Sequence, residues 1–286
     1  MKVGYWSPRT ATIDWCEENY EVSYYIAEFW NTISNFLMIA FPVCFLWISR
    51  NWNIGFEFKM CYLSLILVGI GSWAFHMTLL YPMQLLDELP MIWCSCLLLN
   101  TVELCREFSI SLTERFLNYV SQIRFKMERN ATNLKTNLLI IYSIVVTFTY
   151  LCIPNPLLHH SCYALLVIYT IYRTVQIVKI EQRSRNIALI SASTYTIGFF
   201  FWNIDNIFCK YLQNFRSSEF SLINPLSQMH AWWHIFSGFG SYFYLIFLTH
   251  ISMKHRSENP QSYVIGYIVP IVRPTSSTNN KSRRVL

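Results

Sequence analysis

The chain has 286 residues and a formal net charge of +6; 53% of its residues are hydrophobic, 17% aromatic and only 13% charged, against about a quarter charged in an ordinary soluble domain. Apolar residues gather in stretches of roughly eighteen or more, the length that a bilayer requires, so the composition excludes a soluble globule and indicates one polytopic membrane domain. The basic residues form no stripe with interleaved aromatic residues, which excludes nucleic acid as a partner.

Residues 1–28 form an acidic segment ahead of the first apolar run. Their five carboxylates belong to Asp14, Glu17, Glu18, Glu21 and Glu28. Cleavable signal peptides need an early apolar run, and transit peptides are poor in acidic residues. We therefore expect this segment to remain in the protein and the first membrane span to direct targeting.

Seven apolar stretches follow, and each is long enough to cross a bilayer. Runs such as LLIIYSIVVTFTYL lack the alternating polarity of a barrel strand, so the spans are expected to be helices. The sequence thus predicts an all-α integral membrane protein, a seven-helix bundle over residues 29–252, with spans near 29–49, 60–81, 83–105, 137–154, 157–178, 187–209 and 230–252.

The connections between the spans differ in length and composition. The second and third spans are expected to join tightly around Tyr81 and Pro82, and the fourth and fifth through Pro154-Asn155-Pro156. The polar connection 106–136 is expected to hold a surface helix. The tail, residues 253–286, is expected to be largely disordered because of its polar composition.

The distribution of basic residues predicts the orientation. Of the 22 Lys and Arg residues, all but Lys2, Arg9, Lys210 and Arg216 fall in segments that follow the odd-numbered spans. By the positive-inside rule, the N-terminus is lumenal and the C-terminus cytosolic.

Polar and ionisable side chains within the spans cluster near the lumenal face. Ser72 and His76 are four residues apart, as are His230 and His234, so each pair projects from one helix face. Asp87 follows the tight turn and returns to the same depth. Three imidazoles and one carboxylate suit Zn²⁺. The alternative at this point is that the histidines lie at helix ends, hydrogen-bonded and free of metal.

A second group of possible ligands lies in the acidic N-terminal segment. Its carboxylates, together with Asn19, supply oxygen ligands, which suit a hard cation such as Ca²⁺. The spacing does not match an EF-hand loop, so a solvated acidic segment is the alternative.

Two other features are expected to be structural. His159 and His160 begin a span and are expected to cap it or to face lipid headgroups, and Glu103 is expected to pair with Arg106.

Six sequence blocks, in order, resemble the motifs of the alkaline ceramidase family. They are DWCEENY, YIAEFWNT, VGIGSWAFHMTL, QLLDELPMIW, WNIDNIFC and HAWWHIFSGFGSY, and the likeness runs from Gly4 to about residue 250. The resemblance implies a seven-helix amidase of the endoplasmic reticulum or Golgi membrane. Such an enzyme hydrolyses ceramide, or phytoceramide or dihydroceramide, to a sphingoid base and a fatty acid.

The resemblance also implies roles for particular residues. Zinc is held by His76, His230 and His234, with Asp87 and Ser72 around the metal and its water; calcium is held by Asp14, the Trp15 carbonyl, Glu17, Asn19 and Glu28; and Cys16 pairs with Cys209. Asp87 is the candidate general base and Ser72 the candidate oxyanion donor. The alternatives are a seven-helix receptor and a proton-coupled transporter, although no duplicated half is visible.

Overall fold

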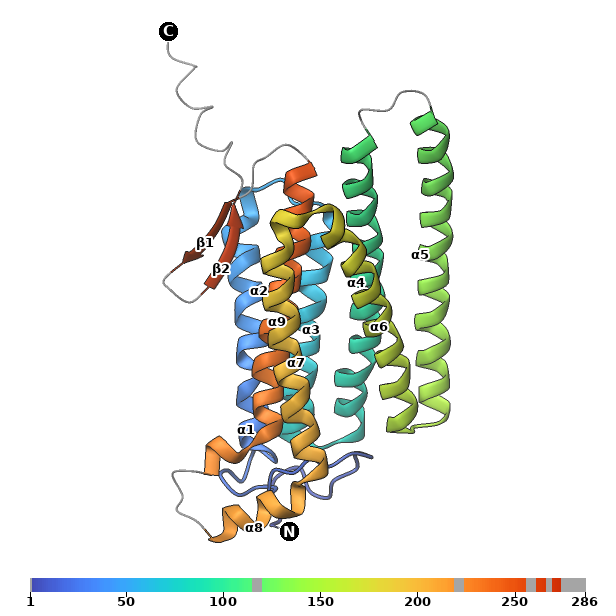
Figure 1. The fold of residues 1–286 in the computed structure, drawn as a ribbon. Coiled ribbons are helices and arrows are strands. Elements are labelled where there is room, and N and C mark those ends of the chain that lie inside the picture. The colour runs from blue at the N-terminus through green and yellow to red at the C-terminus, as the bar shows by residue number, and fades with distance from the viewer. Residues whose placement is uncertain (1, 115–119, 219–223, 256–260, 266–268, 274–286) are drawn as a thin grey trace.

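The computed structural model describes residues 2–114, 120–218, 224–255, 261–265 and 269–273 (Figure 1). Within this part of the chain the prediction of seven spans is confirmed. The helices long and apolar enough to cross a membrane are Phe29–Asn51, Phe56–Thr78, Tyr81–Ile110, Leu134–Cys152, Pro156–Ile180, Gln182–Ile207 and Met229–His255.

The elements follow one another along the chain with short connections. In order they are α1 (Phe29–Ser34), α2 (Phe36–Ile48), η1 (Ser49–Asn51), α3 (Phe56–Thr78), α4 (Tyr81–Glu114), α5 (Val120–Cys152), α6 (Pro156–Ile180), η2 (Gln182–Ser184), α7 (Arg185–Ile207), α8 (Cys209–Ser218), η3 (Asn224–Ser227), α9 (Met229–His255), β1 (Gln261–Ile265) and β2 (Val269–Arg273). The first span consists of α1 and α2, which are separated at Asn35.

Helix α9 lies at the centre of the bundle (Figure 1). Inside the protein, 61% of its most apolar stretch is buried, against 11% for α5. The main core joins α9 to α2, α3 and α4 through large side chains such as Phe45, Tyr62, Tyr242 and Phe247. Since α5 leaves its apolar residues exposed, it suits contact with lipid.

Two turns have a clear chemical basis. Leu79 takes a left-handed conformation at the end of α3, and α4 begins two residues later at Tyr81. Pro82 therefore lies in the first turn of α4, where a missing N–H costs little. The Asn155 side chain caps α6 by accepting the N–H of Leu157, and Pro156 is the first residue of that helix. Both tight connections expected from the sequence are present.

The structure corrects one expectation. The connection 106–136 does not hold a separate surface helix in its described residues, because α4 continues to Glu114 and α5 begins at Val120. Most of the tail lies outside the described residues, so its expected disorder stays a prediction, but β1 and β2 pair as an antiparallel hairpin within it. Strand β2 contacts α9 and places Ile271 in the main core, so burial of an apolar side chain stabilises this segment.

Candidate metal centre

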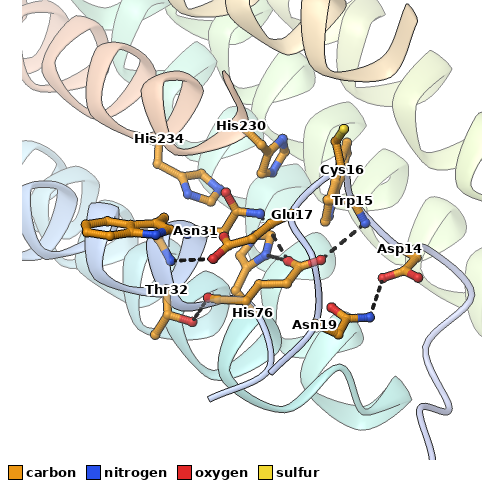
Figure 2. A network of polar contacts seen from close by, with 12 residues as sticks. Asp14, Trp15, Cys16, Glu17, Asn19, Asn31, Thr32, His76, His230 and His234 are labelled. Carbon is orange, nitrogen blue, oxygen red and sulfur yellow. Dashed lines mark hydrogen bonds and ion pairs between the residues drawn. The ribbon is translucent and has the colours of Figure 1, made fainter. Parts of the chain in front are cut away.

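Three histidines meet at the end of the bundle where the N-terminal segment and α8 lie (Figure 1). His76 comes from the last turns of α3, and His230 and His234 come from the first turns of α9. Each is at most 4% exposed. The donor atoms of all three lie within 4.8 Å of one another, and Figure 2 shows the rings of His230 and His234 directed towards His76.

Neighbouring side chains contact the Nδ1 atoms of two of these rings. His76 Nδ1 lies 2.5 Å from Glu28 Oε2, and donation from this nitrogen to the carboxylate leaves the His76 lone pair on Nε2. His234 Nδ1 lies 2.9 Å from the Ser34 oxygen, which donates its own proton to the Asn31 carbonyl at 2.9 Å and can accept from His234. The Asn35 side-chain nitrogen lies 3.4 Å from the same His234 atom.

His230 is held differently, by stacking and through its backbone. The Trp15 ring stacks on it with the centroids 3.8 Å apart. Asp205 accepts the His230 backbone N–H at 3.1 Å and, through its other oxygen, the Cys16 N–H at 3.2 Å. His230 Nδ1 is buried and has no hydrogen-bond partner among the described residues.

This arrangement fits a zinc ion. Three buried imidazole donors this close together could hold a divalent cation, and Zn²⁺ accepts nitrogen ligands while leaving a position for water. The carboxylate and hydroxyl behind the rings act as the outer partners that orient zinc-binding histidines.

The backbones that carry Ser72 and Asp87 approach each other through close packing of α3 and α4 at Gly71. Ser72 is buried one turn before His76. A Cβ added at the adjacent Gly71 would come within 2.1 Å of the Leu86 carbonyl oxygen and 3.0 Å of the Asp87 nitrogen. Glycine therefore permits the contact that brings the start of α4 to this part of α3. The group of three histidine donors does not include Asp87 in the part of the chain that the structure describes.

The N-terminal segment covers this end of the bundle through backbone hydrogen bonds. The N–H groups of Ala27 and Glu28 donate to the carbonyls of Met77 and His76, and Thr10 and Ala11 both donate to the Leu79 carbonyl. The Cys16 and Cys209 sulfurs are joined in the structure, with the Cα atoms 5.2 Å apart. The segment is thereby held over the three histidines.

Two of its acids are buried, in contrast to a solvated acidic segment. Glu17 is 5% exposed and Glu28 is fully buried, whereas the Glu21 carboxylate is exposed and pairs with Lys2. Burial, together with the charge of the nearby Glu28, raises the pKa of Glu17 to about 8. Burial likewise raises the pKa of Glu28 to about 8, so near neutral pH its charged form depends on the His76 N–H and on a nearby cation. Two buried carboxyl groups this close are a suitable setting for a cation.

The contacts of the expected calcium ligands within this N-terminal segment are shown in Figure 2. Both Glu17 oxygens accept backbone N–H groups from Trp30 and Asn31 at 2.8 Å. Asp14 accepts from the Asn19 side chain at 3.2 Å, while the Asn19 amide oxygen is buried and has no hydrogen-bond partner among the described residues. A buried, unpartnered oxygen in a segment that also carries two buried carboxyl groups fits a hard cation such as Ca²⁺.

Sequence reasoning missed the residues that orient the rings. Ser34 and the Glu28–His76 contact were not anticipated. One signal was available: Asn31, Thr32, Ser34 and Asn35 are polar residues at the start of an apolar span, and all are buried.

Two expectations about structural residues also change. His159 is 1% exposed and faces α4 rather than lipid headgroups. Glu103 does lie 3.5 Å from Arg106, but its closer partners are Arg173, which binds both carboxylate oxygens, and Lys135 at 2.7 Å. Glu103 thus joins α4 to α5 and α6.

Comparison with known proteins gives consistent matches over nearly the whole chain. The family model described as Ceramidase matches residues 7–275. The chain is 38% identical to alkaline ceramidase 3 of Mus musculus, with 94% of each chain covered. It is 31% identical to alkaline ceramidase YPC1 of Saccharomyces cerevisiae, over 87% of this chain and 78% of the yeast protein. It is also 28% identical to an alkaline ceramidase of Arabidopsis thaliana, with 94% of each chain covered.

Proposed function

The chain belongs to the ceramidase family, and from this premise we propose that it hydrolyses the amide bond of ceramide, releasing a sphingoid base and a free fatty acid, with zinc as cofactor. The substrate is ceramide, phytoceramide or dihydroceramide within the membrane. The relatives named as ceramidases match along nearly the full chain, so a receptor or a proton-coupled transporter is not favoured.

The observation that carries the zinc proposal is the set of three buried imidazoles whose donor atoms lie within 4.8 Å of one another, two of them with an outer partner on Nδ1. His76, His230 and His234 would hold the ion. When bound, zinc supplies a Lewis acid that makes water more acidic and polarises a carbonyl oxygen.

Ser72 is the candidate for stabilising the oxyanion, and Asp87 is the candidate for proton transfer. Ser72 lies one turn from His76, and its hydroxyl would donate a hydrogen bond to the amide oxygen as negative charge develops there. Asp87 would accept a proton from the attacking water and pass it to the leaving amine nitrogen. The close contact at Gly71 supports this pairing, because it brings the two residues to one level of the bundle.

The N-terminal segment would provide the calcium site and the cover of the active site. Glu17, Asn19 and Glu28, with Asp14 and the Trp15 carbonyl, would bind the ion. Because Glu28 also contacts His76 and Trp15 stacks on His230, calcium would keep the zinc ligands in position. A disulfide between Cys16 and Cys209 would tie the segment to the start of α8 in an oxidising lumen. The enzyme would reside in the endoplasmic reticulum or Golgi membrane.

A cavity between α4, α6, α7 and α9 offers room for an acyl chain. Its volume is about 990 Å³, within the size range of small-molecule sites. Val167, Leu189 and Tyr195 are among its lining residues. Tyr195 packs against Trp233, the neighbour of His234 along the chain, so the cavity approaches the metal centre from within the membrane.

Chelation tests this proposal. Purified protein in mixed micelles should release a sphingoid base and a fatty acid from ceramide in equal amounts. A zinc chelator should abolish the release and added zinc should restore it. Activity that survives complete removal of zinc would contradict the zinc proposal, and absence of product from every ceramide tested would contradict the amidase proposal.

A further inference from the structure

A second cluster of metal-ligand residues lies between α4 and α6, outside the centre described above. Glu88 follows Asp87 on α4, and His159 and His160 lie in the first turns of α6. Their donor atoms lie within 4.8 Å of one another. Glu88 and His159 are 4% and 1% exposed, and His160 is half-buried.

The hydrogen bonds around His159 determine which of its nitrogens carries the proton. His159 Nε2 lies 2.8 Å from the backbone carbonyl oxygen of Glu88. A carbonyl only accepts hydrogen bonds, so Nε2 is the donor and a neutral ring has its lone pair on Nδ1. That nitrogen faces Glu88 Oε1 at 3.9 Å.

The Glu88 carboxylate is satisfied on one side only. Its Oε2 accepts from the Tyr150 hydroxyl at 2.5 Å and from the Gln84 amide at 3.0 Å. Oε1 is buried and has no hydrogen-bond partner among the described residues, and the same is true of His159 Nδ1. Two unsatisfied acceptors therefore face each other across a buried gap, which is unfavourable unless a cation or a donor lies between them.

The dimensions of the gap favour a metal ion over a shared proton. At 3.9 Å the two atoms are too far apart for a hydrogen bond. An ion with bonds of about 2.1 Å reaches both atoms at once. His160 supplies a third donor, and its half-buried ring leaves a position for water. Two imidazoles with one carboxylate suit Zn²⁺ among the common divalent ions.

The second cluster is close to the first but separated from it by aromatic rings. His160 packs on Trp202 with ring centroids 5.7 Å apart, and Trp202 packs on Trp15 at 6.3 Å. Trp15 in turn stacks on His230. The two clusters share no donor residue, so an ion in one does not use the ligands of the other.

We propose that Glu88, His159 and His160 bind a second zinc ion, which joins the start of α6 to α4 beside Asp87. Helix α6 has little other support from the protein, because only 17% of its most apolar stretch is buried. A metal link to α4 would help to hold its start in place. The ion would position the segment that carries Asp87, and none of its three ligands is assigned a catalytic role.

Metal counting on the purified full-length protein tests the proposal. Wild-type protein should hold about two zinc ions per chain, and Glu88→Gln and His160→Gln should each hold about one. Gln at position 88 retains an acceptor for Tyr150, and His160 is half-buried, so both variants should fold. His250→Gln is the matched control: this histidine lies near the opposite end of α9, contacts Ser184, and should leave the count at two.

A spectroscopic measurement separates the two centres. His230→Ala should lose the first ion only, so Co²⁺ added to it should still give the visible absorption of a nitrogen- and oxygen-bound ion. Adding His160→Gln to this variant should remove that absorption. Wild-type protein with a single zinc ion, or Co²⁺ absorption that survives in the double variant His230→Ala/His160→Gln, would overturn the second site and leave the first untouched.

Discussion

Replacing Glu28 with glutamine should weaken zinc binding without removing any metal ligand. The carboxylate accepts a proton from His76 Nδ1 at 2.5 Å and is fully buried, so solvent does not screen the contact. Glutamine retains an oxygen that accepts this bond but loses the negative charge that makes the imidazole a stronger ligand. Loss of such an outer partner typically lowers metal affinity about 10-fold to 100-fold, or ~1.4–2.8 kcal/mol.

The measurement is zinc affinity of the purified apoprotein, by competition with a chelating dye. Glu21→Gln is the control, because the Glu21 carboxylate is exposed and pairs only with the surface residue Lys2 in the described structure; it should keep wild-type affinity. Since Glu28 is also a proposed calcium ligand, the titration is run at zero and at saturating calcium. Wild-type affinity in Glu28→Gln, or a loss that vanishes in saturating calcium, would refute a direct role of Glu28 in orienting His76.

Three further predictions concern the N-terminal segment and the topology. Non-reduced peptide mapping should find Cys16 linked to Cys209, and two free thiols would remove the disulfide. Glu17→Gln should reduce the rise in melting temperature that calcium produces, whereas Glu21→Gln should not; an unchanged calcium response in Glu17→Gln would remove Glu17 from the site. The sequon at Asn130 lies in a segment expected to be cytosolic and outside the described side chains, so it should carry no glycan. A mass shift that is sensitive to endoglycosidase and removed by Asn130→Gln would reverse the orientation.

The part of the fold set by the bilayer was predictable from the sequence. Long apolar runs predicted the seven helices, and the positions of His76, His230 and His234 predicted that these side chains meet. Their convergence follows from shared depth, because helices that cross one membrane must align their ends. Span ends were less predictable, since they depend on local features such as the left-handed Leu79.

The residues that orient the site were not predictable, because they depend on how a non-helical segment folds back. Glu28 contacts His76 because the N-terminal segment folds back over the helix ends, and no periodic pattern in the sequence predicts that path. Ser34 contacts His234, although the two residues are 200 positions apart in the sequence. His159 was expected to cap its helix or to face the headgroups, because only its position at a helix start could be seen in the sequence, and its neighbour Glu88 on another helix could not. Long-range polar contacts of this kind need the tertiary structure.

Zinc content and ceramide turnover, measured on the same preparations, test the central claim most directly. His230→Ala should lose one equivalent of zinc together with turnover, and the His250→Ala control should lose neither. Ser72→Ala and Asp87→Asn should retain zinc while turnover falls about 10²-fold or more, because these side chains act on the substrate and its water. Full turnover in His230→Ala, or wild-type protein that is active and free of zinc, would contradict the account.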